Sequence, residues 1–248
     1  MKVLILAAGY GVRLHPLTLN KPKALLEVGS SPILTRICEK IASIKECDGI
    51  FIVTNAKFFN AIEAWSKQLT LPFKIQVIND GTTSNEDRLG AIGDMSLALE
   101  RMKVVDDILL IAGDNLFEFN INHFCHFAQD KSPHISVALY DVKDKTLAKQ
   151  YGIVSIDSTA KIIEFIEKPQ MPKSTLASTG LYFIPRTKVA KVKEYMKIGI
   201  TQDALGNFIK WIARQEPVYG YVFTEGWFDI GSLEALKKAE EHYADTQK

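Results

Sequence analysis

Short apolar runs alternate with longer amphipathic stretches in the first half of the chain. Runs of Val, Ile and Leu are typical of buried parallel strands, and apolar residues three and four positions apart are typical of the helices that cover them. Strands are predicted at Lys2–Leu6, Ile50–Thr54, Ile75–Ile78 and Ile108–Ile111. Helices are predicted at Pro32–Ile44, Phe58–Gln68 and Leu89–Arg101. This order is that of βαβ units, which predicts an α/β fold.

The second half changes character, because strand-like runs follow one another with fewer helices between them. Strands are predicted at Ile135–Tyr140, Ile153–Ile156, Ile162–Ile166, Gly180–Ile184 and Val218–Phe223. Helices are predicted at Thr187–Met196, Asp203–Arg214 and Leu233–Tyr243. We expect a mixed sheet that extends over the ligand. No internal repeat, glycine-serine linker or C-terminal hexapeptide repeat is found, so residues 1–248 are expected to form one domain.

Composition narrows the class of protein further. The 248 residues are 47% hydrophobic, enough for a large core, and 30 basic against 29 acidic residues give a net charge of +1. Without a long run of one charge, neither a nucleic-acid nor a membrane-binding face is expected. Three cysteines without zinc-site spacing indicate a reducing compartment. The apolar run Val3–Ala8 is too short for a signal peptide or a membrane span, so a cytoplasmic protein is expected.

The first predicted strand runs into a glycine-containing loop, Ala7–Arg13. Gly9 and Gly11 let backbone amides approach an anion, and Arg13 adds a fork of donors, so a triphosphate would suit this loop. The structural alternative is a simple turn after a strand. A dinucleotide fingerprint is excluded because Leu14 stands where its third glycine is required, and no Gly-Lys-Ser/Thr ending indicates a P-loop.

A second basic position follows in the segment Asn20–Leu26, where Pro22 separates two lysines. A lysine on a stiff backbone loses less conformational freedom when it meets a phosphate. This favours Lys23 as a phosphate ligand. Lys21 could equally be a phosphate ligand or a solvated surface side chain.

Two aspartates are candidates for a metal site. Asp114 follows the predicted strand Ile108–Ile111, at the carboxyl end where ligands of open α/β sheets bind. Far downstream, Asp229 lies between aromatic and glycine residues. Asp114 could instead be a turn or helix-capping residue, and Asp229 could instead cap a helix that begins near Leu233. If they converge, two carboxylates could hold Mg²⁺, which prefers oxygen ligands and keeps waters and substrate phosphates in its shell.

Between the aspartates, Lys168 lies at a strand end between Glu167 and a proline. Together with Gly152 and the pair Thr179-Gly180, this segment offers a cation, close backbone approach and hydroxyls to a phosphorylated sugar. A surface strand end is the plain alternative.

Seven short motifs occurring in this order resemble those of the sugar-nucleotide pyrophosphorylase family, which includes glucose-1-phosphate thymidylyltransferase and glucose-1-phosphate uridylyltransferase. The likeness covers nearly the whole chain. The motifs are Ala7–Arg13, Lys21-Pro22-Lys23, Gly113-Asp114-Asn115, Tyr151-Gly152, Glu167-Lys168-Pro169, Thr179-Gly180 and Trp227-Phe228-Asp229-Ile230-Gly231.

The resemblance implies a three-layer Rossmann-like nucleotidyltransferase fold around a mostly parallel mixed sheet. It also implies that residues 1–120 bind the nucleotide and residues 121–248 the sugar phosphate. Magnesium would be held by Asp114 and Asp229. The predicted nucleotide-binding residues are Leu6, Ala7, Ala8, Gly9, Gly11, Arg13, Lys23, Thr83, Asn85 and Gly90. The resemblance implies that Arg13 and Lys23 bind the triphosphate, and Thr83 and Asn85 are predicted to contact the base. The implied sugar-phosphate-binding residues are Asn115, Gly152, Glu167, Lys168, Thr179 and Gly180.

Two departures from the family pattern stand out. Val12 replaces a hydroxyl residue that often precedes the arginine, which removes one phosphate donor and leaves the backbone loop intact. The segment Gly81–Asp94 replaces the glycine-rich pattern with which many relatives read the base, so the preferred nucleotide stays open.

The expected reaction is in-line attack by a sugar 1-phosphate oxygen on the α-phosphorus of a nucleoside triphosphate, with release of pyrophosphate. Because a phosphate monoester is largely ionised near neutral pH, positioning and charge neutralisation matter more than a general base. The catalytic set would be Arg13, Lys23, Asp114, Lys168 and Asp229.

Three alternatives stay open at this stage. The same chemistry could serve another acceptor, as in a cytidylyltransferase for phosphocholine. The chain could be a catalytically silent nucleotide-binding regulatory subunit, although all five charged residues are present. A glycosyltransferase is disfavoured because it would show Asp-x-Asp where Asp114-Asn115-Leu116 stands. His123, Cys125 and His126 are interpreted as helix-surface or core residues instead of a metal site. Trp65 and Trp211 are interpreted as packing residues, and oligomerisation is left open.

Overall fold

The structure is a computed structural model that describes residues 1–103, 106–199 and 204–245. Nine strands form its central sheet: β1 Lys2–Leu6, β4 Ile50–Thr54, β5 Ile75–Asn79, β6 Ile108–Ala112, β8 Ile135–Asp141, β9 Gly152–Ile156, β10 Ile162–Glu167, β11 Leu176–Ile184 and β12 Val218–Phe223. Their order is β10-β9-β11-β6-β1-β4-β5, with β8 added on β11 and β12 on β8. The strands of the first half pair in parallel, whereas β11 meets β6 antiparallel, so the sheet is mixed.

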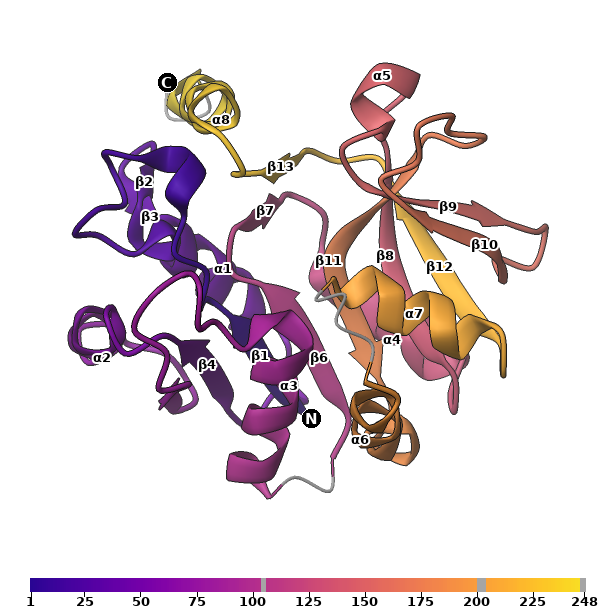
Figure 1. The fold of residues 1–248 in the computed structure, drawn as a ribbon, viewed down its shortest axis with the longest axis horizontal. Coiled ribbons are helices and arrows are strands. Elements are labelled where there is room, and N and C mark those ends of the chain that lie inside the picture. Colours follow the sequence, from indigo (N-terminus) through magenta and orange to yellow (C-terminus); the bar gives the residue numbers. More distant parts are fainter. Residues whose placement is uncertain (104–105, 200–203, 246–248) are drawn as a thin grey trace.

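Helices cover both faces of this sheet and make three layers (Figure 1). One core takes side chains from α1 Ile33–Ile41, α2 Phe59–Ser66, α4 Ile121–Asp130 and α8 Leu233–Asp245. The other takes them from α3 Gly90–Met102, α6 Ala190–Lys197 and α7 Leu205–Ala213. Successive residues of a strand point to opposite faces, so Val3 and Ile5 of β1 enter the first core and Leu4 the second. The predicted three-layer α/β fold is confirmed.

The observed elements differ from the predicted ones mainly in the second half. β11 begins at Leu176, four residues before the predicted start, because the polar run Ser178-Thr179-Gly180 hides the strand pattern and its pairing register with β8 shifts there. Neither α4 nor the short helix α5, Lys145–Ala148, was among the predicted elements. Asp203, the predicted start of the helix observed as α7, lies outside the described residues.

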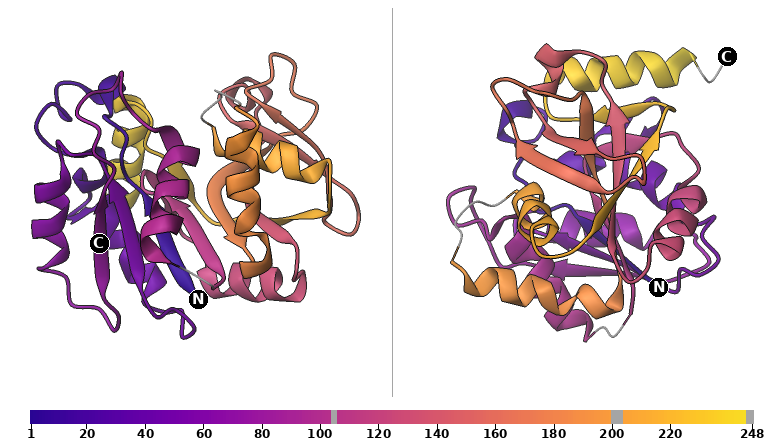
Figure 2. Two further views of the ribbon diagram at one scale, coloured as in Figure 1. Left: turned by 60° about the horizontal axis from the view of Figure 1, so that its bottom comes forward. Right: turned by 90° about the vertical axis from the view of Figure 1, so that its right-hand side faces the viewer.

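Two small ribbons complete the fold. β2 Glu27–Val28 pairs with β3 Ser31–Pro32, and β7 Asn115–Phe117 pairs with β13 Trp227–Asp229. After β13 the chain returns to the first half, where α8 contacts β2 (Figures 1 and 2). The last part of the chain thereby crosses the edge of the sheet at which β1 and β6 end. Among the described residues, no helix combines the length and apolar character needed to cross a membrane.

Candidate active site

Two adjoining pockets open where β1 and β6 end, at the edge of the sheet where ligands of open α/β sheets bind. The first, of about 520 Å³, is lined by the loop after β1, by residues before and within α3, and by Asp114. The second, of about 310 Å³, lies among β9, β10, β11 and β13. Arg13 and Asp114 line both pockets, so they mark the junction between them.

The loop after β1 is held in a defined shape by its own backbone. Gly11 has a φ of 64°, in the left-handed region that glycine adopts without cost. The Thr18 hydroxyl donates to the Gly11 carbonyl at 2.8 Å, and the Asn55 side chain donates to the Ala8 carbonyl at 2.8 Å. Arg13, in the short 3₁₀ turn Val12–Leu14 that follows, is exposed. The loop thus offers backbone at the pocket wall and a guanidinium at its rim.

The β7–β13 ribbon places Asp229 beside Asp114. Asp114 lies between β6 and β7, Asn115 is the register partner of Asp229, and the Ile230 amide donates to the Asp114 carbonyl at 3.0 Å. The two aspartates, distant in sequence, therefore meet at the junction of the pockets. Neither aspartate caps a helix, because Asp229 is a strand residue and Asp114 lies in the turn between β6 and β7. The alternative of a turn position is confirmed for Asp114.

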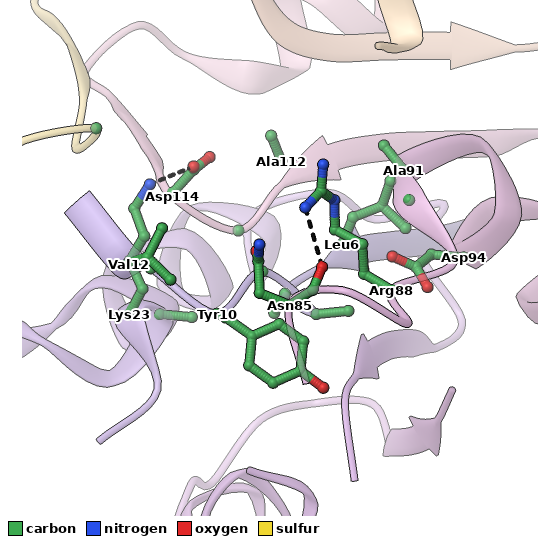
Figure 3. Close-up of a pocket in the computed structure, with 18 of the residues that line it drawn as sticks. Leu6, Tyr10, Val12, Lys23, Asn85, Arg88, Ala91, Asp94, Ala112 and Asp114 are labelled. Atoms are coloured by element: carbon green, nitrogen blue, oxygen red, sulfur yellow. Dashed lines mark hydrogen bonds and ion pairs between the residues drawn. The ribbon is translucent and has the colours of Figure 1, made fainter. Parts of the chain in front are cut away.

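The pKa values of the two carboxyl groups are shifted in opposite directions. Burial, and then the neighbouring Asp114 carboxylate, raises the pKa of Asp229 to about 6, although Lys23, Arg13 and Lys168 oppose this shift. Burial also acts to raise the pKa of Asp114, but the Lys23 ammonium lies 2.6 Å from its Oδ2 and holds that pKa below its usual range (Figure 3). Asp114 is therefore the ionised partner of a lysine, and the charge of Asp229 is only partly compensated.

These two carboxyl groups fit a magnesium ion. Mg²⁺ is commonly bound through one or two carboxylates and takes further oxygen ligands from water and substrate phosphates. A divalent cation would relieve the unfavourable ionisation that raises the pKa of Asp229. In the parts of the chain that the structure describes, no group of three or more His, Cys, Asp or Glu side chains could hold a metal.

Substituting Asp229 is expected to stabilise the metal-free protein. The pKa of Asp229 in the folded protein, about 6, exceeds the ordinary aspartate value of 3.8. The stability that this carboxyl group contributes is therefore present below pH 4 and is lost as the pH rises through 6. Asp229→Asn cannot ionise, so its free energy of unfolding should exceed that of the wild type by about 1–3 kcal/mol at pH 8. At pH 4 the difference should shrink to less than half.

Urea unfolding in the presence of a chelator measures this difference. Glu86→Gln, which neutralises an exposed loop carboxylate, is the matched control and should leave the pH dependence unchanged. An Asp229→Asn variant less stable than the wild type at pH 8 would contradict the expected result.

The second pocket is built around Glu167 and Lys168. Burial raises the pKa of Glu167, and its Oε2 would lie only 3.0 Å from a Cβ on Gly152 and 2.5 Å from one on Gly206. Glycine at these two positions leaves room for the carboxylate. The Lys168 amide donates to the Tyr151 carbonyl at 3.0 Å, which fixes the backbone from which the lysine side chain extends. Away from its junction with the first pocket, where Asp114, Asp229 and Arg13 lie, the second pocket therefore presents the Glu167 carboxylate and the Lys168 ammonium group.

The structure brings most of the predicted site residues to these pockets. Lining residues of the first pocket are Leu6, Ala7, Ala8, Gly9, Gly11, Arg13, Lys23, Asn85, Gly90 and Asp114. Lining residues of the second are Asn115, Gly152, Glu167, Lys168, Thr179, Gly180 and Asp229.

Two predicted contacts need correction. Thr83 does not line either pocket, because its amide and its hydroxyl donate to Asp87 Oδ2 at 3.0 and 3.1 Å and close a surface loop. The Thr179 hydroxyl is buried and donates to the Ala138 carbonyl at 2.9 Å, so it ties β11 to β8 instead of offering a hydroxyl to a ligand.

Several lining residues were not predicted from the sequence. In the first pocket, Tyr10, Arg88 and Asp94 line the wall away from the Lys23–Asp114 pair (Figure 3). Tyr10 was detectable, since it lies between the two glycines of the loop, and Asp94 was detectable as a buried carboxylate on an apolar helix face. In the second pocket, nothing in the local pattern indicates the lining residues Gln150, Tyr182, Leu205 and Gly206.

The fold and site together define a class of protein: a three-layer α/β protein that presents a glycine loop and a carboxylate pair at the carboxyl end of its sheet. Comparison with known families identifies the family within this class. The chain belongs to the nucleotidyl transferase family, whose family model matches residues 2–246.

Relatives cover almost all of this chain. Over 99% of its residues, this chain is 29% identical to the bifunctional protein GlmU of Methanocaldococcus jannaschii. Over 93% of its residues, it is 28% identical to a protein of Sulfolobus acidocaldarius that is provisionally named mannose-1-phosphate guanyltransferase. The chain spans 55% and 60% of the length of these curated relatives.

Solved structures share the fold. A protein of Bacillus anthracis, provisionally named glucose-1-phosphate thymidylyltransferase, superposes with a TM-score of 0.81 at 26% identity, over 99% of this chain and 96% of the other. An apo UDP-glucose pyrophosphorylase superposes with a TM-score of 0.81 at 19% identity, over 100% of this chain and 99% of the other, which shows the common fold alone.

Proposed function

We propose that this chain transfers a nucleotidyl group from a nucleoside triphosphate to a sugar 1-phosphate, releases pyrophosphate, and depends on magnesium. The carboxylate pair at the junction of two pockets is the observation that carries the proposal. One pocket takes the triphosphate and the other takes the acceptor, so their reacting phosphates meet at Asp114 and Asp229. Membership of the nucleotidyl transferase family supports this reaction, and the names of the relatives support a sugar 1-phosphate as acceptor.

In the proposed reaction an oxygen of the acceptor phosphate attacks the α-phosphorus in line, and pyrophosphate leaves on the opposite side. Mg²⁺ bound by Asp114 and Asp229 would neutralise charge on the phosphate oxygens. Arg13 stabilises the negative charge of the departing pyrophosphate, and Lys23 binds the triphosphate. Lys168 holds the acceptor phosphate. No residue needs to abstract a proton, because the attacking phosphate is already ionised.

Acceptor recognition is assigned to the second pocket. The half-buried Glu167 carboxylate accepts hydrogen bonds from sugar hydroxyls, and the close backbone at Gly152 and Gly180 limits the size of the ring that fits. The proposed division of the chain at residue 120 is approximate, since Leu205 and Gly231 also line the first pocket and Arg13 the second.

Phosphocholine is the second candidate acceptor. Tyr151, Trp227 and Tyr182 line the same pocket as the Glu167 carboxylate, and aromatic faces with a carboxylate can bind a quaternary ammonium group. The two acceptors share the same transfer chemistry, and a substrate comparison separates them.

The experiment that tests the function is a matrix of five nucleoside triphosphates against several sugar 1-phosphates and phosphocholine, with magnesium, measured by pyrophosphate release. We expect release with at least one sugar 1-phosphate. Release with phosphocholine alone would replace the sugar by the second candidate. Nucleotide binding without pyrophosphate release in any combination would favour a catalytically silent subunit.

Lys168→Gln is expected to lower kcat/KM for the acceptor by roughly 10- to 100-fold, because a charge-assisted contact to the acceptor phosphate is lost. KM for the triphosphate should stay near the wild-type value. Lys173→Gln, which removes an exposed lysine paired with Glu164 at 2.9 Å, is the control. Steady-state kinetics with each substrate varied in turn measures both values, and an unchanged kcat/KM would remove Lys168 from the acceptor site.

A further inference from the structure

We propose that Trp227 is a positioning residue that sets the orientation of Asp114 through the side-chain amide of Asn115. This inference rests on the proposed function, because it concerns how the metal-binding carboxylate is held. It assigns a role to the indole N–H group that neither the family membership nor the sequence pattern gives it.

The contact chain is short and well buried. Trp227 Nε1 donates to Asn115 Oδ1 at 2.8 Å, and Asn115 Nδ2 donates to Asp114 Oδ1 at 2.8 Å. Trp227 is 9% exposed and Asn115 is 6% exposed. Buried hydrogen bonds of this kind are costly to leave unmade, so all three side chains are confined to one arrangement.

The indole group decides which way the Asn115 amide faces. An indole nitrogen is only a donor, whereas the amide is a donor on one side and an acceptor on the other. With Trp227 on one side and the Asp114 carboxylate on the other, only one amide orientation makes both contacts. The opposite orientation would place two donors together at Trp227 and two acceptors together at Asp114. The N–H group of Trp227 therefore excludes the arrangement that would repel the carboxylate.

The consequence is a carboxylate held at both of its oxygens. Asn115 binds Oδ1 of Asp114, and Lys23 Nζ lies 2.6 Å from Oδ2. The lysine is a charged group on the pocket side that substrate phosphates would attract. The amide is buried and remains as a fixed contact. Asn115 thus acts on the proposed metal ligand directly, which adds a positioning role to the acceptor contact predicted for it.

The same ribbon that carries the indole carries the second aspartate. Trp227 and Asp229 are two residues apart on β13, so their side chains emerge on the same face of the strand. The Trp227 ring is held by Tyr151, at 5.0 Å between centroids, and by Tyr140, at 5.7 Å. Aromatic packing therefore fixes the ring whose N–H group orients Asn115, and strand pairing fixes Asp229 beside Asn115.

The test uses Trp227→Phe, which keeps an aromatic ring and removes the N–H group. Trp65→Phe is the matched control, because Trp65 Nε1 also donates to a side chain, Thr35 Oγ1 at 3.0 Å, in another part of the protein. Binding of Mn²⁺, measured by electron paramagnetic resonance on the full chain with the triphosphate present, should weaken roughly 10-fold in Trp227→Phe, as for loss of outer-shell partners of a metal site. The Mg²⁺ concentration for half-maximal rate should rise similarly, with kcat largely recovered at saturating Mg²⁺.

A double variant shows whether Trp227 acts through Asn115. Asn115→Ala alone should weaken Mn²⁺ binding at least as much as Trp227→Phe, and the double variant should be no weaker than Asn115→Ala. The inference is overturned if Trp227→Phe or Asn115→Ala binds Mn²⁺ like Trp65→Phe, or if the two effects multiply in the double variant. Wild-type protein that binds no Mn²⁺ would refute the proposed function as well. If the wild-type protein binds Mn²⁺ and is active, and the Trp227 and Asn115 variants behave like it, this inference is refuted and the proposed function stands.

Discussion

Asp114→Asn is expected to lower the rate of pyrophosphate release by roughly 100- to 1,000-fold, the loss that follows removal of one preorganised charge from a transition state. Asparagine keeps the shape of the side chain and can still accept the Asn115 hydrogen bond, but it has no charge to hold a cation or to pair with Lys23. Turnover under saturating substrates and magnesium measures the effect.

A matched control for this variant is Asp130→Asn, which neutralises an exposed carboxylate at the end of α4. Circular dichroism and the thermal midpoint should show that both variants are folded. A folded Asp114→Asn protein with near-normal pyrophosphate release would eliminate Asp114 from the mechanism, and with it the carboxylate pair as the centre of the reaction.

Arg13→Gln is expected to lower kcat by roughly 100-fold, because the guanidinium stabilises charge that develops on the departing pyrophosphate. The position supports this expectation. Arg13 lines both pockets, and its guanidinium lies 3.4 Å from the position of a Cβ on Gly231, close to Asp229. Since the side chain is exposed, its loss should change the thermal midpoint little.

Arg101→Gln provides the comparison for Arg13→Gln, because Arg101 is an exposed arginine in the last turn of α3. Single-turnover measurements separate the chemical step from product release. If Arg13→Gln changes KM for the triphosphate and leaves kcat unaltered, the guanidinium binds the ground state and gives the transition state no additional stabilisation.

The parallel core could be predicted closely from the sequence. The observed β1 and β4 have the predicted bounds. Buried strands of this kind must be apolar along their whole length, since helices cover both faces, and their pattern is therefore visible without knowledge of the partners. The predicted α/β class and the family resemblance are confirmed. Two of the motifs, Ala7–Arg13 and Gly113-Asp114-Asn115, directly follow the core strands β1 and β6.

The β7–β13 ribbon could not be predicted in this way. Its strands have three residues each, which is too short for a periodic pattern. Trp227 and Asn115 are 112 positions apart, and no local propensity encodes such a pairing. The sequence indicated that two aspartates would converge but contained no signal for the Trp227–Asn115 contact between them.

Loop contacts were the other part that the sequence left undetermined. Thr83 and Asn85 were both predicted to contact the base, yet Asn85 lines the first pocket and Thr83 is turned to Asp87. Small polar residues in a loop can bind a ligand or their own backbone equally well. The choice depends on which way the loop folds back, and that is a property of the tertiary structure.

The distance in sequence between the strands of the β7–β13 ribbon has a consequence during synthesis. On the ribosome, the glycine loop, Lys23 and Asp114 emerge well before β13. A nascent chain of this length therefore carries Asp114 and Lys23 without Asp229, the second carboxylate of the pair. The carboxylate pair forms only when β13 pairs with β7, which is a contact between segments far apart in sequence. Such contacts form more slowly than contacts between neighbouring helices and strands. The carboxylate pair at the junction of the two pockets is therefore completed only after nearly the whole chain has been synthesised.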